Sequence, residues 1–384
     1  MNSQRSASAL TPGSAHRACA IGVAMLLPLP VFAAEGLSGW YSDPDDFRFE
    51  LSGVLMEDFS YLRDIRRLQS PASQWNIRRS TIEAEIGLLQ RLTLELDLGV
   101  DLEQKDVTWR DAYLDVDLPD KWALRIGKMK QSFGILHTTS LKNQLSPERP
   151  MALDMLTLER APGLSLERRI GKALFSTAYF EAEDDDGETI ASALGQFVYE
   201  PESYGFQQAG FSVATQDYNQ ATYRIRTRAG TDVMDNFLRT EKITAERVRY
   251  YGPNAAWQRG RFTVLGEALR TEVSSRKEGD RTYTGAYLQA SWFFTDDQHR
   301  IEDGVLKRVK SGRRPAWELV STWSRLDAYS QGDGFAGDTL GIGLNYYRSD
   351  GIKIMGELNQ LDVRKGYQKD QSGLSFILRL QLAF

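Results

Sequence analysis

The sequence predicts an all-β protein: a transmembrane antiparallel β-barrel of sixteen strands with one long loop folded into its lumen. Three observations support this prediction. The 384-residue chain begins with a segment typical of an export signal. Long segments then alternate apolar and polar residues, and the connections between them alternate between short and long. No apolar run reaches the roughly 18 residues that a membrane-spanning helix needs.

The composition excludes several other classes of protein. One cysteine cannot build a disulfide framework, and three histidines are too few for a typical Cys/His zinc site. Asp and Glu (52) outnumber Lys and Arg (47), which argues against a nucleic-acid binder. The aromatic share of 11% is too high for a disordered chain. We therefore expect no cofactor, no metal and no nucleic-acid partner.

Residues 1–33 form the predicted signal peptide. Two arginines precede the apolar run 18–29, and small residues allow cleavage after Ala33. The remaining chain holds 45 basic and 52 acidic residues, a net charge of −7, and no cysteine. We expect it to form a single barrel domain, residues 34–384, with a short polar lead-in at 34–46.

Two segments carry the clearest alternation of apolar and polar residues. Segment 92–102 has leucine or valine at every second position, and segment 374–384 repeats the pattern and ends on phenylalanine. Successive side chains of a strand point to opposite faces, so each segment has one apolar and one wet face. Strands of soluble sandwiches usually have about 5–6 residues. The longer runs here are typical of tilted strands that cross a membrane.

Weaker alternation predicts further strands along the chain. They lie at 47–55, 82–88, 112–118, 122–126, 282–294, 316–326, 340–346 and 352–358. The predicted connections are short at 89–91, 119–121 and 349–351, and longer at 63–74 and 329–338. The mean hydropathy of −0.42 fits a sheet with only one face in lipid.

The strand count follows from closure of the sheet. An open sheet edge in hydrocarbon would leave backbone groups unpaired, so the strands must form a closed barrel. Seventeen segments are candidate strands, whereas bacterial single-chain barrels have an even number. The irregular segment 221–229 is therefore expected to lie outside the barrel, which leaves sixteen strands, plus or minus two.

The longest connection without alternation, residues 133–163, is the predicted constriction loop. Seven leucine and methionine side chains make it too apolar for a solvated external loop. They are Leu141, Leu145, Met151, Leu153, Met155, Leu156 and Leu158. Folding into the barrel would bury them and narrow the lumen. An external lid or a partner contact is the alternative.

Short motifs follow one another over nearly the whole mature chain. They are 78–83 (RRSTIE), 124–134 (LRIGKMKQSFG), 146–149 (SPER), 224–228 (RIRTR), 286–293 (AYLQASWF), 317–319 (WEL) and 324–327 (SRLD). Their order and spacing resemble the phosphate-selective porins O and P of Gram-negative outer membranes. The resemblance implies a homotrimeric, water-filled diffusion channel surrounded by outer-membrane lipid and lipopolysaccharide. It also implies a preference for phosphate or related small oxyanions.

The resemblance implies four anion-binding, pore-lining residues near the constriction loop. Arg78 and Arg79 occupy a paired-arginine position, and Lys130 precedes the Phe-Gly that opens the loop. Lys142 resembles a loop lysine before the Pro-Glu-Arg motif. Guanidinium groups bind oxyanions as fixed forks, and a lysine acts as a compact charge. On a regular strand only one of two adjacent arginines faces inward; Arg79 has the inward parity, and Arg78 would need a twist.

An arginine-rich stretch is expected to line the vestibule of such a channel. Arg224, Arg226 and Arg228 share one strand face by period two, and Arg239 extends this row. Several binding positions in series would let an anion enter and leave a pore. The alternative is an ordinary lumen wall in which acids such as Glu241 neutralise the arginines.

The sequence departs from the family in its acidic residues. Eight of them have the wet parity on three neighbouring strands: Glu83, Glu85, Glu95, Asp97, Asp101, Asp111, Asp115 and Asp117. Such a wall makes a general porin with weak or cation-leaning selectivity the alternative function.

An enzyme is the less favoured class. Only His137 and His299 remain after the predicted cleavage, and no Gly-x-Ser-x-Gly motif or metal-binding spacing accompanies them. The basic connection around 307–314 is predicted to lie on the periplasmic side by strand alternation.

Overall fold

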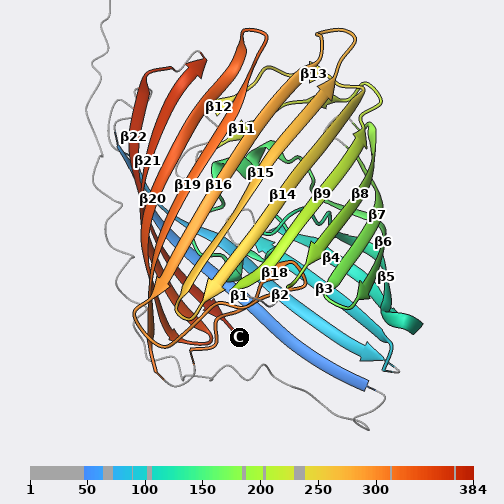
Figure 1. Ribbon diagram of the computed structural model, residues 1–384, viewed down its shortest axis with the longest axis vertical. Helices are drawn as coiled ribbons and strands as arrows, with labels where there is room; N and C mark the ends of the chain where they lie inside the picture. Colours follow the sequence, from blue (N-terminus) through green and yellow to red (C-terminus); the bar gives the residue numbers. More distant parts are fainter. Residues whose placement is uncertain are drawn as a thin grey trace, which may run out of the picture. The chain divides into compact units, whose positions relative to one another are not determined.

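Sixteen strands form one closed antiparallel barrel in the computed structural model (Figure 1). The structure describes residues 47–63, 72–88, 90–101, 106–183, 187–201, 205–228, 238–311, 314–366 and 369–384. The predicted signal peptide and lead-in lie outside these residues. No helix in the described part is long and apolar enough to cross a bilayer. The predicted fold class and strand number are confirmed.

The barrel strands follow one another in chain order around the sheet. They are β1 (Phe47–Arg63), β2 (Ala72–Leu88), β3 (Leu92–Asp101), β4 (Asp106–Leu118), β5 (Trp122–Lys130), β6 (Arg160–Ile170), β7 (Ala173–Glu183), β8 (Thr189–Tyr199), β9 (Phe206–Asp217), β14 (Arg247–Arg259), β15 (Phe262–Ser274), β16 (Arg281–Phe293), β19 (Ala316–Ser330), β20 (Asp333–Ser349), β21 (Ile352–Gly366) and β22 (Gln371–Ala383). Several extend well beyond the segments that alternation predicted, because polar residues on both faces near their ends obscure the pattern.

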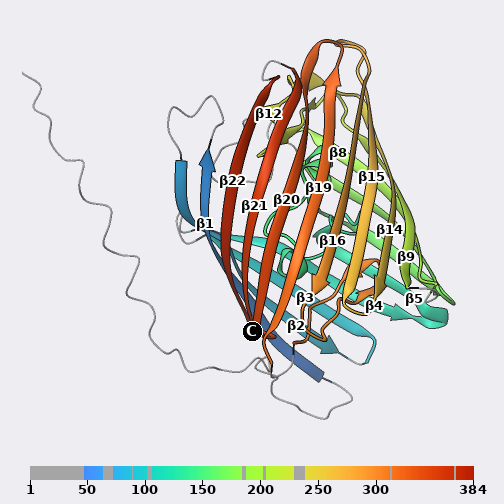
Figure 2. The same ribbon diagram turned by 60° about the vertical axis from the view of Figure 1, so that its left-hand side comes forward.

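The last strand closes the barrel against the first (Figure 2). On β22, Leu378 and Leu380 face outward, whereas Arg379 between them is fully buried on the lumen side. The C-terminal Phe384 exchanges two backbone hydrogen bonds with Gly53. A Cβ atom at Gly53 would lie 2.9 Å from the backbone oxygen of Thr81 and also against the ring of Phe384, so the seam is too close there for a larger residue without a shift of the backbone.

The described residues between β9 and β14, 218–228 and 238–246, stay outside the barrel sheet, as predicted for 221–229, of which residue 229 lies outside the described part. The four short strands described there pair with one another: β10 (Thr222–Tyr223) with β13 (Ile243–Thr244), and β11 (Arg226–Thr227) with β12 (Leu238–Arg239). The barrel thus keeps an even number of strands. This connection, 218–246, packs against the loop that follows β5 through a hydrogen bond from the Tyr223 hydroxyl to the Met155 carbonyl (3.4 Å).

The prediction of a long connection at 329–338 is wrong. β19 and β20 remain paired up to Ser330 and Asp333, and only two residues link them. Both residues have positive φ, 52° at Gln331 and 88° at Gly332. Paired positive φ values are typical of a two-residue type I′ hairpin turn. The glycines that resemble a loop in the sequence therefore make a tight turn.

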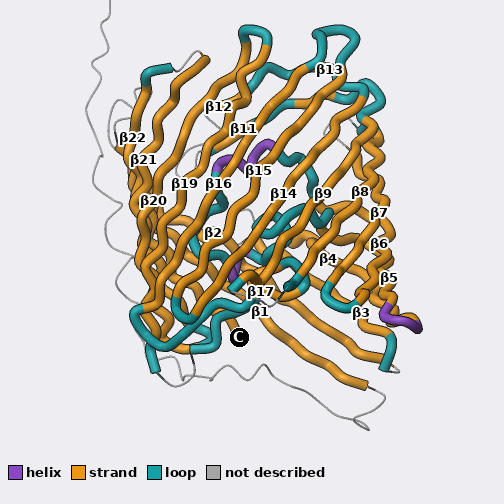
Figure 3. Tube along the Cα trace, in the orientation of Figure 1, coloured by secondary structure: helices purple, strands orange, loops and turns teal. Residues whose placement is uncertain are grey.

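Among the described parts of the chain, three long connections start from the ends of the barrel. By the alternation of antiparallel strands, 131–159 and 218–246 start from one end, and 294–315 starts from the end that carries the C-terminus. The first contains the 3-10 helices η2 (Leu141–Asn143) and η3 (Met151–Met155), drawn purple in Figure 3. The third contains the hairpin of β17 (Ile301–Glu302) and β18 (Val305–Leu306). A further 3-10 turn, η1 (Pro119–Lys121), links β4 to β5.

Candidate functional site

The constriction loop, which we define as residues 131–159, turns into the lumen at its first residues. Ile135 and Leu136 donate their backbone N–H groups to one oxygen of Glu267 on β15, each over 2.9 Å. Gly134 has a φ of +61°, and a Cβ there would lie 1.8 Å from the other oxygen of Glu267. The glycine of the Phe-Gly motif is thus explained, because only glycine permits this close approach.

Further hydrogen bonds hold the loop against strands β19 and β20. Ala152 donates its N–H to the Ser324 hydroxyl (2.9 Å), and Asn345 donates to the Leu145 carbonyl (2.8 Å). The apolar side chains that predicted inward folding, such as Leu145, are buried in the main hydrophobic cluster. The loop is therefore an inward constriction, as predicted, and not an external lid.

A β-bulge between β1 and β2 brings both predicted arginines to the lumen. Met56 pairs with Arg79 and Glu57 pairs with Ile77, so Arg78 is an extra residue in the register. A bulge bends its strand and re-aims the side chain. The twist that Arg78 needs is therefore present.

A second bulge lies between β3 and β4. Asp97 pairs with Asp111 and Leu98 pairs with Trp109, which leaves Arg110 as the extra residue. The two bulges together deliver arginines to the same region, because the charge of Arg110 acts directly on Arg79.

A cavity of about 530 Å³ lies between this wall and the constriction loop. Two acidic residues line it, Asp154 and Glu159, against six basic residues. The basic residues are Arg110, Lys128, Lys130, Arg149, Arg160 and Arg226. Arg79 lies within electrostatic range of three of them, Arg110, Arg149 and Arg160. The cavity therefore has a strong excess of positive charge.

The cations of the cavity differ in how they are held. Arg110 pairs with Asp97 (3.0 Å), and Arg160 makes a bidentate pair with Asp111 (2.9 Å for both bonds). Lys130 instead donates to the carbonyl of Thr138 (3.5 Å).

Arg149 donates from Nη2 to the carbonyls of His137 and Thr139, each over 3.4 Å. Within the described residues, no carboxylate forms an ion pair with Arg79, Lys130, Arg149 or Arg226. We call these four cations of the constriction uncompensated, meaning that no carboxylate of the described residues forms a direct ion pair with them.

The acidic wall predicted from strand parity is largely paired with cations. Glu83 binds Lys142 (2.6 Å), Glu85 binds Arg48, Asp97 binds Arg110, Asp111 binds Arg160 and Asp115 binds Arg125 (2.7 Å). Glu95 accepts a hydrogen bond from Tyr113, whose ring lies under the Arg125 guanidinium. Parity identified the acids, but their partners come from neighbouring strands and from the loop.

The remaining predicted residues do not form a single row. Arg224 and Arg239 line a separate cavity of about 630 Å³ with Lys242, Glu241 and Asp333. Arg226 faces Arg239 in the register of β11 and β12, yet it lines the constriction cavity.

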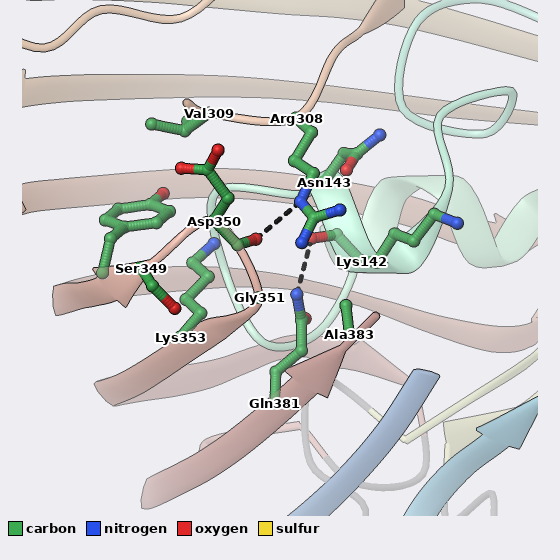
Figure 4. A pocket seen from close by; sticks show the side chains of 11 residues that line it. Lys142, Asn143, Arg308, Val309, Ser349, Asp350, Gly351, Lys353, Gln381 and Ala383 are labelled. Atoms are coloured by element: carbon green, nitrogen blue, oxygen red, sulfur yellow. Dashed lines mark hydrogen bonds between the residues drawn. The ribbon is translucent and has the colours of Figure 1, made fainter. Parts of the chain in front are cut away.

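Two other predicted residues lie on the constriction loop or act on it. The charge of Arg228 acts on Asp154, and its neighbour Thr227 hydrogen-bonds to the same carboxylate. Lys142 lies beside a small cavity of about 20 Å³ that Arg308 and Lys353 also line (Figure 4).

Burial shifts the pKa values of three groups on the constriction loop. It raises the pKa of Asp154 to about 7, although Thr227 and the charges of Arg149 and Arg228 oppose this shift. It lowers the pKa of Arg149 to about 10. Burial, together with the charges of Lys130 and Arg149, holds the pKa of His137 well below its usual value, so this imidazole is neutral at pH 7.

A family model described as "Phosphate-selective porin O and P" matches residues 49–384. The chain belongs to this family. It is a porin of the Gram-negative outer membrane, and the constriction is part of a channel and not an enzyme active site. A comparison with curated protein sequences finds no match.

Solved structures of other outer-membrane proteins share the fold at low sequence identity. OmpT of Vibrio cholerae has a TM-score of 0.61 and 13% identity, covering 91% of this chain and 100% of its own. An anion-selective porin of Comamonas acidovorans has a TM-score of 0.58 and 12% identity, covering 88% and 100%. The channel DcaP of Acinetobacter baumannii has a TM-score of 0.56 and 9% identity, covering 91% and 100%.

The sequence missed several residues that build the constriction. Arg110, Arg149 and Arg160 line the cavity, and Glu267 anchors the loop from β15. Arg149 lies in the SPER motif and could have been chosen from it. Arg160 and Glu267 occupy ordinary strand positions, and only the register of the closed barrel brings them to the loop. Arg110 is the extra residue of a bulge, which alternation does not predict.

Proposed function

We propose that this porin is a passive diffusion channel that prefers phosphate or related small oxyanions. The observation that carries the proposal is the group of uncompensated cations in the constriction: Arg79, Lys130, Arg149 and Arg226. Lys130, Arg149 and Arg226 line the cavity together with Arg110 and Arg160, which carboxylates hold in fixed positions, and Arg79 lies within electrostatic range of it. Guanidinium forks with fixed geometry match the oxygens of phosphate-like ions.

A second group of cations supports an approach path to this site. Arg224, Arg239 and Lys242 line the cavity of about 630 Å³, and the β11–β12 pair links it to Arg226 in the constriction. An anion could therefore pass from one cationic group to the next without a single deep trap, as conduction requires.

The assembly is proposed from the neighbours. One of the similar structures is a trimer form of OmpT of Vibrio cholerae, with a TM-score of 0.56 and 11% identity. We infer that this porin forms a homotrimer in the outer membrane, in contact with lipid and lipopolysaccharide.

Single-channel recording in planar bilayers tests the selectivity. We expect phosphate at low concentration to block the chloride current, and the reversal potential in a chloride gradient to lie on the anion side. Lys130→Gln or Arg226→Gln should each weaken the phosphate block by roughly threefold to tenfold, because each removes one charge from the cavity.

The alternative is a general porin with weak or cation-leaning selectivity, which the net charge of −7 outside the predicted signal peptide favours. A reversal potential on the cation side, with no block by phosphate, would establish it.

A further inference from the structure

Two pairs of consecutive residues contribute to the constriction. In each pair, the two side chains have different surroundings. On β2, Arg78 precedes Arg79; on the loop, Glu148 precedes Arg149. The second member of each pair is an uncompensated cation of the constriction. The first members bind each other: Arg78 donates from Nε and Nη2 to the two oxygens of Glu148, over 2.7 and 2.9 Å.

This ion pair continues into the seam of the barrel. Arg379 on β22 donates to Glu148 (2.6 Å) and, through two nitrogens, to Asp58 on β1 (2.7 and 2.6 Å). It also donates to the carbonyl of Pro147. Asp58 and Arg379 face each other in the register of β1 and β22, and both are fully buried.

The four residues form a network with no net charge, which we call the latch: Arg78, Glu148, Arg379 and Asp58. Burial by itself would raise the pKa of Glu148, but the charges of Arg78 and Arg379 and their hydrogen bonds hold it below its usual value. Glu148 is therefore ionised at pH 7, and the guanidinium of Arg78 is occupied by a carboxylate.

We propose that the latch is a positioning device: the Arg78–Glu148 pair fixes the two backbone segments from which Arg79 and Arg149 reach the permeant anion, and Arg78 does not bind that anion. A bidentate pair restricts both orientation and distance. Each of its members is bonded covalently to a constriction cation, so loss of the pair frees both cations at once. This inference rests on the proposed function, because it assigns roles within the same constriction.

The variant Glu148→Gln separates the two possible roles of Arg78 by the sign of its effect. If the latch positions Arg79 and Arg149, this variant loosens both, so phosphate block weakens by roughly tenfold and the chloride current gains brief closures. If Arg78 is an anion ligand, the variant releases it and removes a negative charge, so phosphate block strengthens. A block that is unchanged or stronger would overturn the proposal.

Non-additivity gives the second test. Because Arg78→Gln and Glu148→Gln break the same contact, the double variant should bind phosphate no more weakly than the poorer single variant. The double variant Arg79→Gln/Glu148→Gln should bind phosphate more weakly than either single variant. A double Arg78→Gln/Glu148→Gln variant whose losses simply add would contradict the latch.

Glu85→Gln is the matched control, since it also removes one acid of the lumen. Its partner, Arg48, lies on β1, and among the described residues no hydrogen bond or ion pair joins the two to the constriction loop. We expect its block to match that of the wild type. If Glu148→Gln fails to assemble into heat-modifiable barrels, Arg78→Lys takes its place as the test variant. It keeps the positive charge but loses the bidentate guanidinium, so it should weaken the phosphate block.

The closures of the chloride current distinguish failure of the latch from failure of the proposed function. If wild type shows no phosphate block, the proposed function is wrong. The Glu148→Gln channel should still be noisier than wild type in chloride alone. A quiet Glu148→Gln current beside an intact wild-type block would remove the latch and leave the proposed function standing.

Discussion

The acidic wall and the constriction of this porin have opposite balances of charge. On the wall, Asp97 and Asp111 each hold an arginine, and neither carboxylate contributes an unbalanced charge. In the constriction, Arg79 and Arg149 have no ion-pair partner on the pore side among the described residues. A count of acidic residues therefore overstates the negative charge that the wall presents to the pore, because the paired carboxylates are balanced by arginines. On the proposed function, selectivity depends on the charges that are left without a partner.

The wall also supports the constriction. Asp111 orients Arg160 and Asp97 orients Arg110, and both arginines line the cavity. A carboxylate that holds a guanidinium in place can favour anion binding by preorganising the site, even though its own charge opposes an anion.

We expect the largest effect from the loss of two uncompensated cations of the constriction. The double variant Arg79→Gln/Arg149→Gln should weaken phosphate block by about a hundredfold, because each charge-assisted contact contributes roughly tenfold. The reversal potential should move toward the cation side. Concentration-dependent block of chloride current in planar bilayers measures the first, and a salt gradient measures the second. A loss below about threefold would place anion binding elsewhere in the pore.

We expect a smaller effect from a variant of the acidic wall, and its sign is opposite to the one that net charge alone predicts. Asp111→Asn makes the lumen more positive, yet it should weaken phosphate block by about threefold, because Arg160 loses its bidentate partner. Asp111→Glu should restore most of the affinity. The same bilayer titration checks both variants. Stronger block by Asp111→Asn would mean that the wall acts only through its net charge.

The smallest effect concerns pH. Since the pKa of Asp154 is raised to about 7, this carboxyl is mostly neutral at pH 6 and mostly ionised at pH 8. Its ionisation adds a negative charge to the cavity, so anion affinity should fall by about twofold over this range. Sulfate is the appropriate blocking ion because it does not titrate there. The Asp154→Asn channel should show a flat profile, and a slope that persists in it would exclude Asp154 as the source.

Alternation of side chains was sufficient to predict the barrel. It depends only on the period of a strand, so segments such as 92–102 and 374–384 are legible in the sequence. The even strand number followed from closure in lipid, and the connection at 221–229 was correctly excluded from the sheet. The apolar residues of the constriction loop predicted its inward path for the same physical reason, burial.

The residues that hold the constriction loop in place could not be predicted from the alternation of side chains. Glu267 lies 131 and 132 positions from the N–H groups it binds, and Arg379 lies 231 positions from Glu148. Such contacts depend on the register around the whole ring. The bulges at Arg78 and Arg110 each shift one residue out of the regular period, which alternation cannot anticipate.

The burial of Arg379 at the seam has a consequence for biogenesis. Asp58 and Arg379 come from the first and last strands, so they meet only when the ring is complete. The guanidinium that joins them also holds Pro147 and Glu148. If the latch has the role proposed for it, a chain that has not yet paired β22 with β1 lacks the contact that holds Glu148. The constriction would then be complete only when the barrel closes.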